Sequence, residues 1–146
     1  MEIVFPDGTD IIIDSMRNAI GRDVIFNYIE STIPCSACNL DPVTDTSDNS
    51  FCPVCSGEYW IDTISGYTAI AVVTWSPSDR PSWETGGTMA QGDCLIQVKL
   101  TDELEAVLLK TETVTVDNRI MEIKKQMRRG VQTLNRVLLS LIEKER

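Results

Sequence analysis

The spacing of hydrophobic residues predicts one short helix followed by a series of β-strands. Within residues 10–20, apolar side chains recur every three or four positions, as on one face of a helix. Thr9 is a candidate N-cap for this helix, and Gly21 is a natural stop. Residues 22–32 alternate between apolar and polar side chains instead, which predicts a strand that ends at Pro34.

Most of the remaining chain has the β-branched content and the alternation of strands. These strands are predicted over residues 58–64, 67–75, 93–100, 111–116, 119–127 and 133–142. The first two are expected to meet in a turn at Ser65-Gly66, and Thr101 is expected to cap a short helical turn that runs through Leu109.

The closing segment, residues 133–142, fits either a strand or a helical stripe. Turns at Asp117-Asn118 and at residues 128–130 bound the segment before it, and this favours a pair of strands. The order of elements therefore predicts a mainly β domain over residues 1–146: a small barrel or sandwich with a short N-terminal helix.

A long polar loop is predicted over residues 76–92, with several prolines and glycines and with Trp83 near its middle. Compact domains rarely carry so long a loop without a purpose. Two interpretations stay open: a surface excursion with Trp83 folded back onto the body, or a loop that orders against a partner with Trp83 as its anchor.

The chemistry of the chain is concentrated in two Cys-x-x-Cys pairs, separated by thirteen residues. The four candidate metal ligands are Cys35, Cys38, Cys52 and Cys55. Two tight knuckles at this spacing can close a tetrahedral site, for which structural Zn²⁺ is the expected occupant and iron is an alternative. Residues 34–57 are therefore predicted to be an inserted zinc ribbon, whose metal has no open position for catalysis.

Other interpretations of the cysteines are weaker. A disulfide framework would need an oxidising compartment, and the residues before position 30 lack the pattern of a secretory leader. Neither pair opens a helix after a strand, as a redox motif would require. Cys94 lies in an apolar run and is expected to be a buried thiol. No stretch has the roughly 20 apolar residues of a membrane span, so no membrane partner is expected.

Charge is distributed unevenly along this acidic chain, whose net charge is −9. Residues 35–95 hold eight acidic residues against one basic residue, and residues 119–146 hold eight basic residues against three acidic ones. The ribbon has no Lys or Arg, which argues against binding of nucleic acid through phosphates. The uneven distribution of charge instead suits a subunit whose acidic part meets a basic patch on a neighbour. It also suits an acidic part that lines a pore that must not hold DNA.

The residue inventory argues against an enzyme. The chain has no histidine, the commonest general base, and no Gly-rich phosphate loop or nucleophile elbow. Carboxylate pairs such as Asp7 with Asp10 and Asp102 with Glu103 lie in turn-like contexts, where they are expected to act as caps.

The order of these features resembles the neck proteins of tailed bacteriophages, namely the head-closure (stopper) or head–tail connector β-barrels. The resemblance rests on the short helix before Gly21-Arg22-Asp23, on the inserted ribbon that ends in Cys-Pro-Val-Cys-Ser-Gly, on Gly92-Asp93 opening a strand, on the segment Val116-Asp117-Asn118-Arg119-Ile120-Met121-Glu122-Ile123, and on a closing segment that begins Arg136-Val137-Leu138-Leu139.

This resemblance implies a structural virion protein, assembled in the host cytoplasm and located in the neck. It implies a homo-oligomeric ring, such as a dodecamer, between the portal or adaptor and the tail or tail-terminator proteins. Genomic DNA would pass through its channel without sequence-specific contact. A cellular zinc-ribbon adaptor that binds another protein is the alternative. The residues singled out for subunit or partner contacts are Trp83, Arg119, Lys124, Lys125, Arg128 and Arg129.

Overall fold

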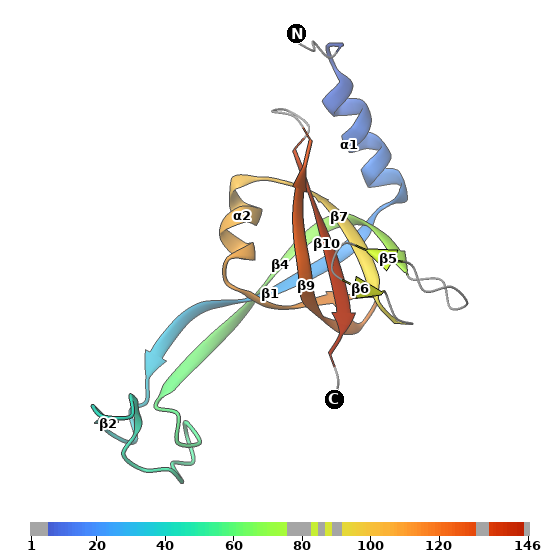
Figure 1. Cartoon of the computed structure of the whole chain (residues 1–146). Coiled ribbons are helices and arrows are strands. Elements are labelled where there is room, and N and C mark those ends of the chain that lie inside the picture. The colour runs from blue at the N-terminus through green and yellow to red at the C-terminus, as the bar shows by residue number, and fades with distance from the viewer. Residues whose placement is uncertain (1–5, 76–82, 85–86, 89–91, 131–134, 145–146) are drawn as a thin grey trace.

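A closed barrel of six antiparallel strands forms the body of the protein (Figure 1). The computed structural model describes residues 6–75, 83–84, 87–88, 92–130 and 135–144. The barrel strands are β1 (Arg22–Pro34), β4 (Trp60–Trp75), β7 (Cys94–Lys99), β8 (Thr111–Val116), β9 (Arg119–Arg129) and β10 (Arg136–Glu143). Around the barrel they follow the order β1-β4-β7-β10-β9-β8, and β8 pairs back with β1. The predicted mainly β fold is confirmed, and it is a barrel.

Every barrel strand contributes side chains to one apolar interior. The alternation expected of half-buried strands is visible in β7, where Cys94, Ile96 and Val98 are buried and the residues between them are not. Helix α2 (Asp102–Leu108) adds Leu104 and Leu108 to the same core. Its N-cap is Thr101, as predicted, because the Thr101 hydroxyl accepts a hydrogen bond from the backbone N–H of Leu104. The remaining core residues are Val24, Phe26, Ala71, Val114, Val116, Met121, Val137, Leu139 and Leu141.

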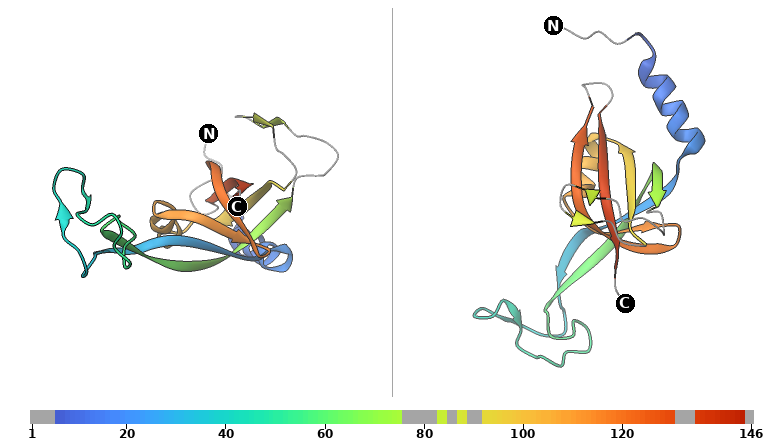
Figure 2. Two further views of the ribbon diagram at one scale, coloured as in Figure 1. Left: turned by 90° about the horizontal axis from the view of Figure 1, so that it is seen from below. Right: turned by 45° about the vertical axis from the view of Figure 1, so that its right-hand side comes forward.

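Strands β1 and β4 form a long hairpin that carries the ribbon away from the barrel (Figures 1 and 2). The expected turn at Ser65-Gly66 is wrong, because β4 is one continuous strand in which Gly66 pairs with Asn27. A Cβ on Gly66 would lie 3.1 Å from the side chain of Ile25. The glycine therefore leaves space for that side chain and does not form a turn. Pairing along the whole of β1 keeps β4 extended.

Other element boundaries also differ from the prediction. β9 continues through Arg128 and Arg129, which were expected in a turn, because both pair with residues of β10. The strand ends just before Gly130, which has φ +118°. Asp117 and Asn118 form the predicted tight turn, both with positive φ.

The C-terminal segment is the strand β10 rather than a helix. Within the predicted loop 76–92, two short strands pair with each other: β5 (Trp83–Glu84) and β6 (Gly87–Thr88). The rest of that loop, apart from Gly92, lies outside the described residues, and so do residues 133 and 134 of the predicted last strand.

Helix α1 (Thr9–Ile20) leads into β1 and stands beside the end of the barrel away from the ribbon (Figure 1). Its N-cap is Gly8, with φ +83°, and not Thr9, which is the first helical residue. The Thr9 hydroxyl donates to the carbonyl oxygen of Pro6 at 2.6 Å, so its side chain turns back to the preceding segment. Gly21 follows the helix as predicted, and its N–H donates to the carbonyl oxygen of Arg17.

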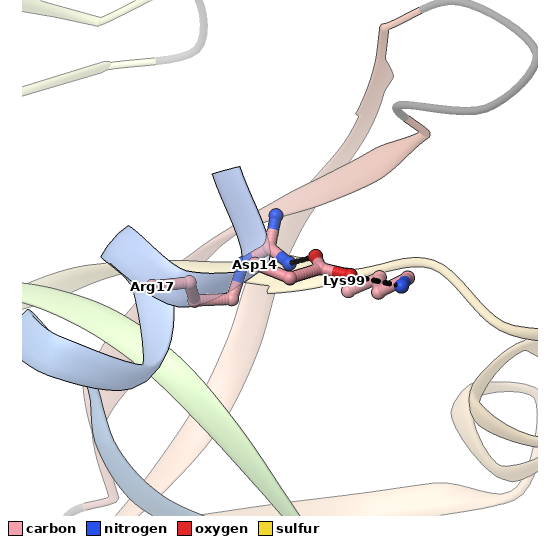
Figure 3. A network of polar contacts seen from close by, with 3 residues as sticks. All are labelled: Asp14, Arg17 and Lys99. Atoms are coloured by element: carbon pink, nitrogen blue, oxygen red, sulfur yellow. Dashed lines mark hydrogen bonds and ion pairs between the residues drawn. The ribbon is translucent and has the colours of Figure 1, made fainter. Parts of the chain in front are cut away.

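Polar contacts attach α1 to the barrel (Figure 3). Asp14 accepts hydrogen bonds from Arg17 at 2.7 Å and from Lys99 of β7 at 2.5 Å. The hydrogen bond from Lys99 is the main cause that lowers the pKa of Asp14 from its usual 3.8. The buried residue of this helix is Arg17, whereas Ile12, Met16 and Ile20 are at least 60% exposed.

We expect Asp14→Asn to loosen α1 from the barrel, because the change removes the carboxylate that joins Arg17 to Lys99. Amide hydrogen exchange over residues 9–20 should accelerate roughly two- to fivefold, as for an ion pair worth up to about 1 kcal/mol. Since the pKa of Asp14 is lowered, the wild-type contact is complete above about pH 3.8 and is lost as the pH falls through the lower folded value. The exchange rate of the variant should not show this change at acid pH.

Asp10→Asn is the matched control, because Asp10 is exposed on the same helix and forms no ion pair with a described residue. Equal amide exchange rates over residues 9–20 in the two variants would show that the Asp14 contacts do not hold α1 to the barrel.

Candidate metal centre

The two Cys-x-x-Cys segments form knuckles at the far end of the β1–β4 hairpin. The first follows β1 directly, and the N–H of Cys35 donates to the carbonyl oxygen of Tyr59 at 2.8 Å, which closes the hairpin at this point. In the second knuckle, the carbonyl oxygen of Cys52 accepts from the N–H of Ser56 at 2.9 Å. The pairing of β1 with β4 therefore brings together two knuckles that are distant in sequence.

Backbone conformations after the second knuckle require small residues. Ser56 and Gly57 both have positive φ, at 53° and 92°. A Cβ on Gly57 would lie 2.8 Å from the carbonyl oxygen of Ser50, so no larger residue fits without a shift of the backbone. The close approach of the chain to itself at this point sets the position of Cys55.

The four sulfur atoms lie together, each within 4.8 Å of the others. Two of the distances between the knuckles are 3.8 Å from Cys35 Sγ to Cys52 Sγ and 3.5 Å from Cys38 Sγ to Cys55 Sγ. In a tetrahedron with Zn–S bonds of ~2.3 Å, neighbouring sulfurs are about 3.8 Å apart. The four predicted ligands are thus at a spacing that could hold a single metal ion.

The thiols of the cluster differ in pKa because their surroundings differ. A hydrogen bond from Ser47 lowers the pKa of Cys38, but loss of solvent and the three neighbouring thiols outweigh it and raise this pKa to about 12. Burial raises the pKa of Cys55, but the backbone N–H groups of Tyr59 and Gly57 and the thiols of Cys38 and Cys52 lower it to about 6. The site therefore favours one thiolate even without a cation, and a bound cation would favour the others.

The ribbon has almost no core apart from these sulfurs. Between residues 35 and 58, the buried residues are Cys35, Ser47, Cys52 and Cys55. Tyr59, just before β4, and Ile61 of β4 pack against the cysteines. Because so little apolar surface is buried, the order of the ribbon must depend on whatever links the sulfurs.

The connector between the knuckles consists mainly of exposed turns. It contains the short hairpin of β2 (Leu40–Asp41) and β3 (Thr46–Ser47). Asp41 and Asp48 use their carboxylates to accept backbone N–H groups, from Val43 at 2.9 Å and from Asn39 at 3.0 Å. These aspartates therefore stabilise turns.

The structure separates the other predicted contact residues. All five basic residues lie on β9, but in different environments: Arg119 lies 5.4 Å from the ring centroid of Trp75, and Arg128 forms an ion pair with Glu105 of α2. Lys124 is the extra residue at a bulge in the pairing with β10. Lys125 and Arg129 lie on the same strand, and Trp83 pairs with Thr88 in the β5–β6 hairpin.

Two residues that the sequence did not single out are the most exposed large apolar side chains of the ribbon. Phe51 is 92% exposed and Val43 is 89% exposed. Their apolar character was visible in the sequence, but nothing in the spacing indicated that both would point into solvent rather than pack on the cysteines. The remaining hollow of interest, between α1 and the barrel, is lined by Asp14, Arg17 and Lys99, whose charges already pair with one another.

No protein-family model matches this chain, and no curated protein matches it. Neither described helix has the length and apolar content needed to cross a membrane.

We expect Cys52→Ser to abolish tight metal binding and to disorder the ribbon while the barrel stays folded, because the barrel core contains none of the four ligands. Metal content by elemental analysis should fall from one ion per chain to a small fraction of that. Hydrogen exchange should rise sharply over residues 35–58 and stay unchanged in the barrel strands. Loss of the barrel's β signal would contradict this separation.

Cys94→Ser is the matched control, because Cys94 is fully buried in the barrel and remote from the other thiols in the fold. A hydroxyl in this apolar site should cost about 1–3 kcal/mol of unfolding free energy and leave the metal content unchanged. The two serine variants should therefore show opposite effects on metal and on barrel stability.

Proposed function

We propose that this chain is a structural, non-enzymatic protein of the tailed-phage neck, where it forms a ring that joins the head portal or adaptor to the tail. The observation that carries the proposal is a closed six-stranded antiparallel barrel whose β1–β4 hairpin ends in a four-cysteine ribbon. This arrangement agrees with the element order on which the resemblance to head-closure and connector barrels rests. Assembly would occur in the host cytoplasm, and the mature location would be the virion neck.

Within this proposal the metal is Zn²⁺, with a structural role. Four thiols and no other ligand make a closed site, so the ion would have no position for a substrate or water. Zinc also suits a site whose purpose is to hold two loops, because it has no redox chemistry of its own. The ion would keep the ribbon rigid at the end of its hairpin.

An exposed apolar surface on α1 supports a role in assembly. The outward face of α1 presents Ile12, Met16 and Ile20, although polar residues hold the helix to its own barrel. Such an apolar face suits a neighbouring subunit or ring. DNA would pass through the channel without specific contacts. The predicted loop 76–92 with Trp83 would face the channel or contact a neighbouring subunit.

A cellular zinc-ribbon adaptor is the second candidate. The high exposure of Phe51 and Val43 favours it, because an adaptor would use the ribbon itself as its contact surface. The adaptor would act as a monomer or dimer, whereas the neck protein would form a ring by itself or on its partner.

Native mass spectrometry separates these proposals. We expect one zinc ion per chain together with a cyclic oligomer, formed either by the purified chain or on addition of the portal or adaptor ring. One zinc ion in a chain that stays monomeric with neck components would overturn the neck proposal in favour of the adaptor. Iron in place of zinc would overturn only the choice of metal.

A further inference from the structure

The ribbon presents both unpaired carboxylates and exposed apolar side chains. Asp45 lies two residues from Val43 in the β2–β3 turn, and Glu58 follows the second knuckle, which begins one residue after Phe51. Both carboxylates are exposed, and the ion pairs among the described residues include no carboxylate of the ribbon. A partner for this surface should be basic and should also offer apolar contacts.

The outer face of β9 and β10 has the complementary character. Arg129 and Arg136 are direct cross-strand neighbours, and the next outward pair is Met127 with Leu138. These residues point outward, because the alternate β10 position, Val137, is buried in the barrel. This face therefore combines two guanidinium groups with two large apolar side chains.

The two arginines lack an anion within the described part of the chain. Like charges directly opposite each other on a sheet repel, and neither Arg129 nor Arg136 forms an ion pair with a described carboxylate. The Nε atom of Arg136 is buried and has no hydrogen-bond partner. A carboxylate supplied from outside would relieve the repulsion between the two guanidinium groups.

We propose that the ribbon of one copy docks on the β9–β10 face of the next copy, with Glu58 and Asp45 meeting Arg129 and Arg136, and with Phe51 and Val43 meeting Met127 and Leu138. This inference rests on the proposed ring and names the contact that builds it. The ribbon stands beyond the barrel at the end of the β1–β4 hairpin, so it reaches a neighbouring barrel rather than its own (Figures 1 and 2). The contact joins unlike surfaces head to tail, which allows a ring to close.

The test uses Glu58→Lys in the ribbon and Arg129→Glu on β9, each in the metal-loaded full chain. Sedimentation velocity over a concentration series should show that wild-type self-association weakens on the order of tenfold in either variant alone. An equimolar mixture should recover pairs, because the Arg129→Glu chain has an intact ribbon and the Glu58→Lys chain has an intact β9–β10 face. Phe51→Ser should weaken association without a change of charge.

Glu112→Lys on β8 and Lys110→Glu beside it are the matched controls, since both residues lie outside the proposed contact. They should leave association unchanged. A wild-type chain that stays monomeric at its highest soluble concentration would overturn the inference, and so would variants that associate like the wild type or a mixture that fails to pair. If the chain is incorporated into virions but both variants associate like the wild type, this contact alone is overturned. If the chain associates through its ribbon but is absent from virions, the neck proposal alone is overturned.

Discussion

The antiparallel ladder between β1 and β4 is shared by the barrel and the ribbon. Its first half, around Val24 and Ala71, contributes to the closed barrel, and its second half extends beyond the barrel to Pro34 and Trp60, where the ribbon begins. A bulge after Ile29 changes the register between these halves. Because the same two strands serve both parts, the position of the sulfur cluster relative to the barrel is set by backbone hydrogen bonds rather than by side-chain packing.

The two parts are stabilised by different means. The barrel buries apolar side chains from all six strands and from α2, so its free energy of folding comes mainly from the hydrophobic effect. The ribbon buries three cysteines and Ser47, and it can be ordered only through its turns and the groups that link its sulfurs. This division leaves the ribbon surface free of a packing role, which explains how Phe51 and Val43 can be almost fully exposed.

Local sequence signals predicted the elements whose structure is determined locally. The alternation in Thr111–Val116, the cap at Thr101 and the cysteine spacing each depend on neighbouring residues, and all three predictions agree with the structure. The turn expected at Ser65-Gly66 failed because pairing with β1, distant in sequence, keeps that dipeptide extended. The same holds for Arg128 and Arg129, which pairing with β10 retains in the strand. The sequence could supply the four ligands but not the contrast between Cys38 and Cys55, which arises from hydrogen bonds that only the folded ribbon makes.

The orientation of α1 is the clearest departure from the usual use of an amphipathic sequence. Apolar residues at helical spacing normally indicate the face that packs on the protein's own core. Here Asp14 and Arg17 face the barrel and meet Lys99, while Ile12, Met16 and Ile20 face solvent. Much of the apolar surface of this helix therefore stays exposed within one chain, and the ribbon likewise leaves Phe51, Val43 and the carboxylates of Asp45 and Glu58 exposed. Both features lie outside the barrel and near its opposite ends (Figure 1), whereas the barrel itself buries a complete apolar core within one chain.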